Sequence, residues 1–327
     1  MAARTKSAES IKDKLSSLPA NSTDHRIYKV PEHFRKVKRE CYTPFVVSIG
    51  PICYEEFLKS SQELKLRHLE CFMELARIYN DPAYNLGKLQ GFVERWECKA
   101  RSFYADKISL GRDDFLEMLM VDAAFIICYI VLRTVKTSLP INPMKNMMAW
   151  EERVQQDLFL ADNQLPFLFV HELYHAALGR LADENPFKEL VRMFIGQTNI
   201  PGRAAATSTE GRLKVRDGSD VKDLVDFLRI CCLPLNRSHY KNLINKYERP
   251  WCLRPPSAKE LKDAGVNFLA THPKDLLDIK YTGEVLQIPE LSIQDNTEAI
   301  LRSLIFSEQC HHYEDSCFID YVFSSMH

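Results

Sequence analysis

The stretch Asp113–Thr134, DDFLEMLMVDAAFIICYIVLRT, decides the fold of this chain. It opens with two aspartates, which are favoured in the first turn of a helix because the helix dipole is positive there. Ten consecutive apolar residues follow at Ala123–Leu132, between Asp122 and Arg133. A membrane-spanning helix needs about 20 such residues, and a shorter helix that is apolar on all sides is typical of a protein core. The stretch therefore predicts the central buried helix of a mainly helical protein.

Most of the remaining chain has apolar residues at every third or fourth position, which is typical of amphipathic helices. Such helices are predicted at Ser61–Asn80, Leu86–Tyr104, Trp150–Leu160, Pro166–Arg180, Pro186–Ile195, Val221–Cys232 and Asn296–Glu308. A short helix at Ser257–Gly265 is predicted from Ser257 as its cap and Gly265 as its stop. Extended segments are predicted at Ile27–Pro31 and Phe45–Pro51, and a β-hairpin at Leu276–Tyr281 and Glu284–Ile288 around Thr282-Gly283. The fold class is mainly α: a multi-helix globular bundle with a few short strands and one small β-hairpin in the C-terminal lobe.

Changes in composition divide the chain. Residues 1–26 are polar and charged, which predicts a disordered tail, and residues 199–220 are rich in Gly, Ala, Ser and Thr, which predicts a flexible linker. Between and after them lie an N-terminal helical lobe, 27–198, and a C-terminal lobe, 221–327. The last predicted helix, Asn296–Glu308, is apolar enough to need a partner surface, so we expect the lobes to pack as one domain.

The overall charge argues against a nucleic-acid partner. Lys and Arg number 43 and Asp and Glu 44, so the net charge is −1 and the chain has no global basic field. The local basic cluster Arg35–Arg39 is then interpreted as a solvated turn. The first 26 residues contain no apolar secretory leader, and the ten cysteines form no C-x-x-C pair. These features predict reduced thiols and a cytoplasmic protein.

The most specific chemical motif is His171-Glu172-Leu173-Tyr174-His175, which has the H-E-x-x-H pattern. On a helix the two imidazoles share a face and can bind one zinc ion, and Glu172 can act as a general base on zinc-bound water. The motif supports an alternative function, a zinc-dependent hydrolase with His171 and His175 as ligands.

A structural interpretation of the same residues is favoured. His171, Glu172 and His175 also form the single polar stripe of an otherwise apolar helix. The longer zincin pattern has Gly and His where this chain has Leu178 and Leu181, and no second motif supplies a third ligand. We therefore predict no catalytic, cofactor-binding or metal-binding residue, and no cofactor.

Two further clusters are interpreted structurally as well. Asp113, Asp114 and Glu117 are typical of a helix N-terminus rather than of paired catalytic carboxylates. The cluster of Cys310, His311, His312 and Cys317 has no zinc-site spacing.

Taken together, the motifs resemble the plant family known as domain of unknown function 247. The residues that carry this resemblance span most of the chain in order: Ile27–Pro31, Tyr42–Pro44, Val46–Pro51, Asp114–Leu119, Asp122–Ile126, Asp157–Leu158, Asp162–Phe167, Ala258–Leu261, Ala264–Val266, Ile288–Pro289 and Glu308–His311. The family helix that follows Phe167 usually has no histidine pair, so the resemblance also disfavours the zinc site.

The resemblance implies a mostly helical plant protein with no established enzymatic activity. Relatives usually continue past the position of His327 and end in a hydrophobic anchor, and some grass members are associated with self-incompatibility. We expect a non-enzymatic protein-interaction or recognition and signalling module with a protein partner, without a transmembrane helix in this chain. It is expected in the cytoplasm or, alternatively, on the cytoplasmic face of a membrane through a partner or such an anchor. No sequence pattern identifies the partner, the binding face or the oligomeric state.

Overall fold

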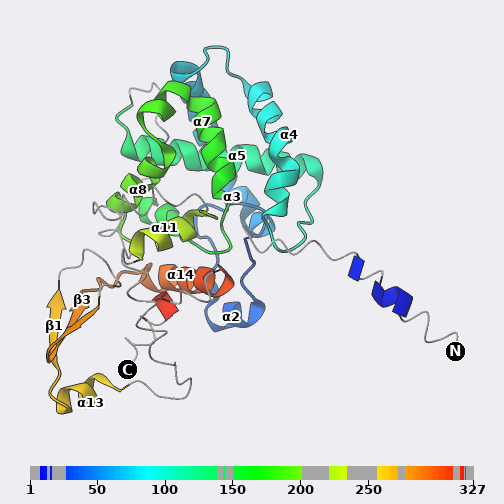
Figure 1. Ribbon diagram of the computed structural model, residues 1–327. Helices are drawn as coiled ribbons and strands as arrows, with labels where there is room; N and C mark the ends of the chain where they lie inside the picture. Colours follow the sequence, from blue (N-terminus) through cyan, green and yellow to red (C-terminus); the bar gives the residue numbers. More distant parts are fainter. Residues whose placement is uncertain are drawn as a thin grey trace.

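The computed structural model describes residues 8–12, 15–16, 27–137, 143, 150–200, 221–233, 256–271, 277, 279–311, 317–319 and 321, and residues 55–60 by their backbone alone. Within these residues the chain is mainly helical and carries one small three-stranded sheet (Figure 1). The predicted fold class is therefore confirmed.

The elements follow one another along the chain with a long helical part first and the sheet near the end. They are α2 (Glu32–Val37), the 3-10 helix η1 (Arg39–Cys41), α3 (Tyr54–Tyr79), α4 (Leu86–Ser102), α5 (Arg112–Thr134), α6 (Glu151–Asp157), α7 (Phe167–Glu184), α8 (Phe187–Gln197), α11 (Leu224–Cys232), α13 (Ala258–Asp263), β1 (Asn267–Thr271), β2 (Lys280–Thr282), β3 (Val285–Pro289) and α14 (Thr297–His311).

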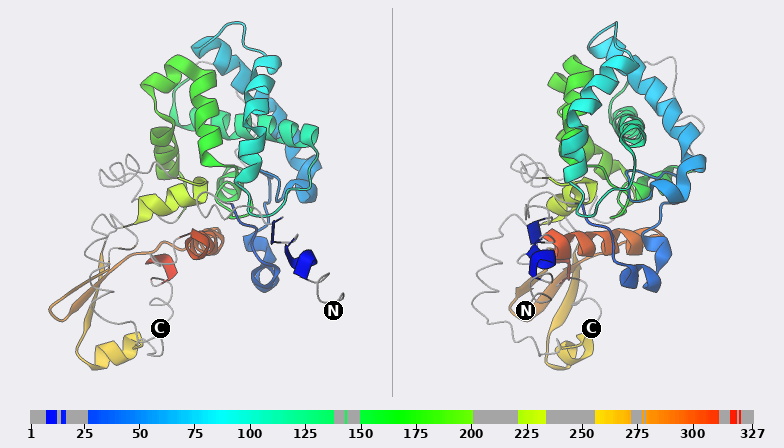
Figure 2. Two further views of the ribbon diagram at one scale, coloured as in Figure 1. Left: turned by 45° about the vertical axis from the view of Figure 1, so that its right-hand side comes forward. Right: turned by 90° about the vertical axis from the view of Figure 1, so that its right-hand side faces the viewer.

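Helix α5 is the centre of the core, as its sequence predicts. It packs against α3, α4, α7 and α8, and Figure 2 shows it end-on among its neighbours in the right-hand view. Within the described residues it is the one helix long and apolar enough to cross a membrane, yet 83% of its most apolar window is buried inside the protein. That burial is what a core helix requires.

Helix α7 has a kink at Gly179, where φ is 27° and ψ is −100°. The side chain of Asn80, which follows α3, fills this kink and donates from Nδ2 to the carbonyl oxygen of Ala176 at 2.8 Å. A Cβ atom at position 179 would lie 2.8 Å from Asn80 Oδ1. The kink therefore fixes the end of α3 against α7, and the helix continues past the predicted end at Arg180.

The sheet has the strand order β1-β3-β2. The predicted hairpin is confirmed, because β2 and β3 pair antiparallel around Gly283. The sequence analysis predicted no strand at Asn267–Thr271 and was wrong there, since β1 pairs parallel with β3. A five-residue strand after the short helix α13 has too few alternating positions for a periodicity to stand out.

A buried carboxylate holds the segment that precedes α3. Asp157, at the end of α6, is fully buried, and its oxygens accept hydrogen bonds from the backbone N–H groups of Phe45, Val46 and Val47 at 2.9, 2.6 and 2.9 Å. Burial raises the pKa of Asp157 to about 6, and these three donors oppose the rise. A carboxylate can stay in a protein core only when donors satisfy it.

Asn163 and Asp122 hold the next residues of the same segment. Asn163 Oδ1 accepts from the N–H of Ile49 at 2.6 Å, and Asp122 Oδ2 accepts from the N–H of Gly50 at 2.8 Å. The other oxygen of Asp122 pairs with Lys65 Nζ of α3 at 2.6 Å, and both side chains are buried. The predicted extended segment Phe45–Pro51 thus forms no strand, because side chains take the N–H groups that a neighbouring strand would bind.

Gln164 joins this network to the C-terminal helices. Its Nε2 donates to the carbonyl oxygens of Leu158 and Leu160, both at 2.9 Å, and its Oε1 accepts from the N–H of Leu224 at 3.0 Å. Nearby, the N–H of Ala161 donates to Ser303 Oγ of α14 at 3.1 Å. Helices α11 and α14 of the predicted C-terminal lobe therefore bond directly to the N-terminal one.

Most of the predicted tail and linker lies outside the described residues. Of the linker, 199–220, only residues 199 and 200 are described, and of the tail, 1–26, only residues 8–12 and 15–16, which are helical and exposed.

Replacement of Gly50 by Ala is expected to lower the free energy of unfolding by about 3 kcal/mol. Gly50 has a φ of 73°, and a Cβ atom there would lie 2.4 Å from the backbone oxygen of Gln164. The matched control is Gly283→Ala, with a φ of 63° and no heavy atom within 4 Å of the added Cβ. The control should lower the free energy of unfolding by only about 1 kcal/mol. Urea unfolding of both variants measures these losses. Equal losses of unfolding free energy in the two variants would contradict a close contact between Gly50 and the backbone of Gln164.

A second prediction concerns pH. Asp223 is the N-cap of α11 and accepts from the N–H of Asp226 at 2.8 Å; burial and then the charge of Asp226 raise its pKa to about 7. A pKa above the unfolded value of about 4 stabilises the folded state at low pH, and this stabilisation is lost as the pH rises through about 7. Asp223→Asn keeps the cap and does not titrate. From pH 5 to pH 8 the free energy of unfolding of the wild type should therefore fall by about 2–3 kcal/mol relative to that of Asp223→Asn.

Urea unfolding across this pH range measures the difference. The exposed Asp183, changed to Asn, is the control and should give no such trend. A stability gap between wild type and Asp223→Asn that stays constant with pH would refute the raised pKa.

Candidate functional site

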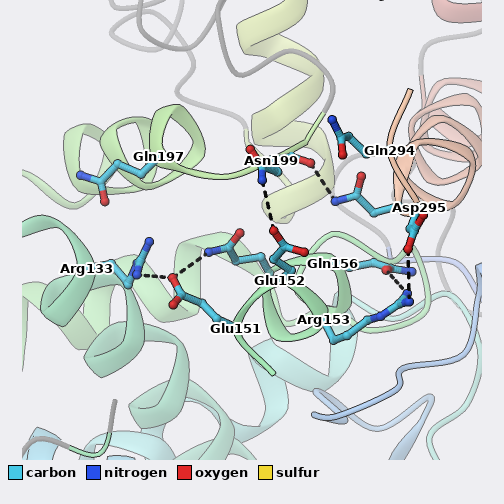
Figure 3. A pocket seen from close by; sticks show the side chains of 11 residues that line it. Arg133, Glu151, Glu152, Arg153, Gln156, Gln197, Asn199, Gln294 and Asp295 are labelled. Carbon is cyan, nitrogen blue, oxygen red and sulfur yellow. Dashed lines mark hydrogen bonds and ion pairs between the residues drawn. The ribbon is translucent and has the colours of Figure 1, made fainter. Parts of the chain in front are cut away.

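A polar pocket lies where four parts of the helical body meet (Figure 3). Its volume is about 510 Å³, and it lies between the C-terminal end of α5, helix α6, the end of α8 and the segment before α14. None of the described residues that line it is apolar: Arg133, Glu151, Glu152, Arg153, Gln155, Gln156, Gln197, Asn199, Gln294, Asp295 and Asn296.

Most charges of the pocket are paired with one another. Arg133 forms an ion pair with Glu151. Arg153 lies 3.8 Å from Asp295 and donates from Nη1 to Gln156 Oε1 at 3.1 Å. The two guanidinium groups are thus already neutralised by carboxylates of the pocket.

Glu152 is the further carboxylate of the pocket and forms no ion pair among the described residues. Its Oε1 accepts from Asn199 Nδ2 at 3.2 Å, which Figure 3 shows as one of the contacts across the pocket. The described lining residues include two cations and three carboxylates, so together they carry a net charge of −1 when all of them are ionised.

Two polar atoms of the pocket lack a hydrogen-bond partner within the described part of the chain. Asn296 is 8% exposed; its Nδ2 donates to the carbonyl oxygen of Asn199 at 2.8 Å, while its Oδ1 accepts no hydrogen bond, and Arg133 Nε also finds no acceptor. Buried polar groups in folded proteins are normally satisfied. Both atoms are themselves buried, so neither is exposed to the open space of the pocket.

The buried network positions this pocket. Helix α6 lines it with Glu151, Glu152 and Arg153 at its beginning and is fixed at its other end by Asp157. Val154, on the same helix, is fully buried. Seven residues are too few for an independently stable helix, so tertiary contacts hold the pocket side chains in place.

The H-E-x-x-H motif lies on α7, away from this lining. His171 and His175 share one face with ring centroids 4.4 Å apart, and His171 Nδ1 lies 3.3 Å from Glu172 Oε1. Burial, followed by the charge of His175, lowers the pKa of His171. Its ring packs against the ring of Phe187, with the centroids 6.4 Å apart.

The motif lacks the remaining parts of a zinc centre in the described residues. Across these residues, no group of three His, Cys, Asp or Glu side chains lies close enough together to hold a metal ion. A zinc site needs at least three protein ligands, so the described residues alone do not complete one. The geometry agrees with the interpretation as a polar stripe on a buried helix.

Other sequence candidates have structural contacts. Arg35 is buried and pairs with Asp162 at 2.8 Å, so the interpretation of Arg35–Arg39 as a solvated turn was wrong for this residue. Asp113 and Asp114 lie in the first turn of α5, as predicted. The cluster around Cys310 cannot be followed in full, because residue 312 lies outside the described residues.

The pocket residues were missed by the sequence analysis. They come from four separate segments, and runs such as Glu151-Glu152-Arg153 are typical of any exposed helix turn. Only the fold brings them together, so no local spacing could have found them.

Comparisons with known proteins give the family. A profile of a family described as plant protein of unknown function matches residues 27–324. A UPF0481 protein of Arabidopsis thaliana is 26% identical over 312 residues, which cover 89% of this chain and 62% of that protein. The chain thus spans less than two thirds of the length of this relative. No solved structure matches the chain described here. The match over nearly the whole chain establishes that this protein belongs to the plant family of unknown function 247.

Proposed function

We propose that the protein is a non-enzymatic recognition module that binds a protein partner through the three-stranded sheet. The supporting observation is an exposed row of apolar side chains across all three strands. This proposal rests on the register of the sheet, on its exposure and on the roles that the buried polar residues already have.

The register aligns the row. Phe268 of β1 and Tyr281 of β2 both pair with Leu286 of β3, and paired residues in neighbouring strands point to the same face of a sheet. The next pair along this face is Ala270 with Ile288. One face of the sheet is therefore apolar over its whole width.

This apolar face is open. Phe268 is 40% exposed and Tyr281 62% exposed, while Leu286 is half-buried. Figures 1 and 2 agree that the sheet projects away from the helical body. Exposed apolar patches of this kind are typical of protein-binding surfaces, and aromatic side chains are enriched at the centres of such surfaces.

The buried polar residues support a binding role over a catalytic one. Asp157, Asn163 and Asp122 each bind backbone N–H groups or a buried lysine. Groups that are saturated in this way are not available for proton transfer to a substrate.

The family resemblance supports a plant recognition or signalling role, of which the self-incompatibility of some grass relatives is an example. The location that belongs to this proposal is the cytoplasm or, alternatively, the cytoplasmic face of a membrane.

The alternative function is a zinc-dependent hydrolase with His171, Glu172 and His175. The shared face of the two imidazoles favours it. A third ligand would have to come from outside the described residues.

We expect Phe268→Ser/Tyr281→Ser to abolish partner binding. Truncation of a central aromatic side chain in an interface typically costs 2 kcal/mol or more, which is at least about tenfold in affinity. The measurement is quantitative mass spectrometry of proteins that co-purify with the tagged chain from plant tissue. At least one protein should be retained by the wild type and lost about tenfold with the double variant.

The matched control is Leu66→Ser/Leu86→Ser, which removes two side chains of similar exposure, 45% and 57%, from α3 and α4. This control should retain the partner. If every co-purifying protein is retained equally by all three forms, the sheet is not the binding face.

A separate prediction concerns the alternative. The wild type, loaded with zinc and then desalted, should contain no more zinc by elemental analysis than His171→Ala/His175→Ala, and well below one ion per chain. Two imidazoles without a third ligand hold zinc too weakly to survive this step. About one zinc per wild-type chain that disappears in the double variant would instead support the hydrolase.

A further inference from the structure

We propose that the outer edge of strand β1 pairs with the same strand of a second copy of this chain, so that two sheets join into one across a two-fold axis. The proposal does not depend on the protein-binding face of the sheet. It rests on the backbone groups that point away from β3, on the uncharged sequence of β1 and on an alignment in which the strand is complementary to itself.

Strand β1 is an edge of the sheet. The strand order is β1-β3-β2, so β3 covers one side of β1 and no described strand covers the other. In Figure 1, β1 lies at the left-hand margin of the sheet. Every residue of β1 is at least partly exposed, and the side chains of Phe268 and Leu269 are 40% and 51% exposed. Among the described residues, nothing therefore blocks a further strand beside β1.

The register shows which backbone groups of β1 point outward. Asn267 donates its N–H to the carbonyl oxygen of Glu284 at 2.7 Å, and the carbonyl oxygen of Thr271 accepts from the N–H of Glu290 at 3.0 Å. Because alternate residues of a strand direct their N–H and C=O groups to opposite sides, the odd-numbered residues of β1 bond to β3. The groups that point outward are the N–H and C=O groups of Phe268 and Ala270.

The sequence of β1 lacks the features that protect an edge strand. Proteins discourage pairing at sheet edges by placing charges or proline there. The other edge of this sheet, β2, has three residues, of which one is Lys280. Strand β1 has the sequence NFLAT, without a charge or a proline. A second copy of β1 therefore brings no like charge against the first.

One alignment makes β1 complementary to itself. Two copies related by a two-fold axis present the same surface to each other, and an axis perpendicular to the sheet makes the two strands antiparallel. In an antiparallel ladder, a hydrogen-bonded pair of opposite residues exchanges two N–H to C=O bonds. With Leu269 on the axis, Phe268 of each copy faces the partner's Ala270, so all the outward groups are used in four hydrogen bonds. Centring the ladder on Phe268 or on Ala270 would use the groups of only one of them within β1.

The side chains fit the same alignment. Opposite residues of paired strands lie on the same face, so the bulky Phe268 of each copy lies beside the small Ala270 of the other. On the opposite face the two Leu269 side chains meet at the axis, where the Cα atoms of such a pair are only about 4.5 Å apart. Pairing would thus cover apolar side chains that one chain leaves exposed. Five residues on each side make a small interface, so we expect a transient dimer.

Sedimentation velocity of the purified full chain, from low micromolar to several hundred micromolar, tests the proposal. The wild type should shift reversibly from monomer toward dimer as its concentration rises. Leu269→Lys places two like charges opposite each other at the axis and should weaken self-association at least about tenfold. The matched control, Leu66→Lys, adds the same charge at a position of similar exposure, 45%, on α3. This control should self-associate as the wild type does.

Two further measurements test the alignment itself. Leu269→Lys and Leu269→Glu should each self-associate weakly, whereas an equimolar mixture of the two should associate at least as strongly as the wild type, because opposite charges then meet at the axis. Ala270→Pro removes an outward N–H without removing a bond to β3, since proline is tolerated at edges. It should weaken self-association at least about fivefold. Circular dichroism and the melting temperature show that each variant is folded.

The proposal is overturned if the wild type stays monomeric at the highest concentration or if Leu269→Lys self-associates as strongly as the wild type. It is also overturned if the mixture of the two charge variants associates no more strongly than either variant alone. None of these outcomes decides whether the apolar face binds a partner, because the purified chain is measured alone and Leu269 lies on the other face of the sheet from Phe268.

Discussion

The rest of the structure depends on the carboxylate of Asp157, which accepts hydrogen bonds from the backbone N–H groups of Phe45, Val46 and Val47. This contact joins the end of α6 to the segment before α3, more than a hundred residues earlier in the chain. Burial of the carboxylate without donors, or of the N–H groups without an acceptor, would cost about several kcal/mol of folding free energy. Because each satisfies the other, a segment with no strand partner can cross the interior, and Asn163 and Asp122 continue the same arrangement as far as Gly50.

The same arrangement gives the polar residues between α6 and α7 a structural role. Asp157, Asn163 and Gln164 are at most 2% exposed and bind backbone groups. They are polar because irregular backbone needs donors and acceptors that no helix or strand supplies. The side chains that line the pocket at the other end of α6 lie outside this network.

Sequence reasoning succeeded where a local pattern determines the outcome. Helix α5 follows from its apolar run, and α13 follows from its predicted cap Ser257, which the structure shows in a capping box with Glu260. It failed where the outcome depends on distant partners. Arg35 was taken for a solvated residue because its partner Asp162 is more than a hundred residues away, and the pocket was missed because its side chains come from four segments.

The sheet and the polar pocket are joined by one short segment. Residues 290–296 run from the end of β3 to the start of α14, and Gln294, Asp295 and Asn296 line the pocket. The side chain of Asn296 also holds the backbone of Asn199. The chain that attaches the sheet to the helical body therefore runs along the wall of the pocket. The apolar row on the sheet and the polar pocket thus differ in the chemistry they can recognise, but the backbone between β3 and α14 connects them mechanically.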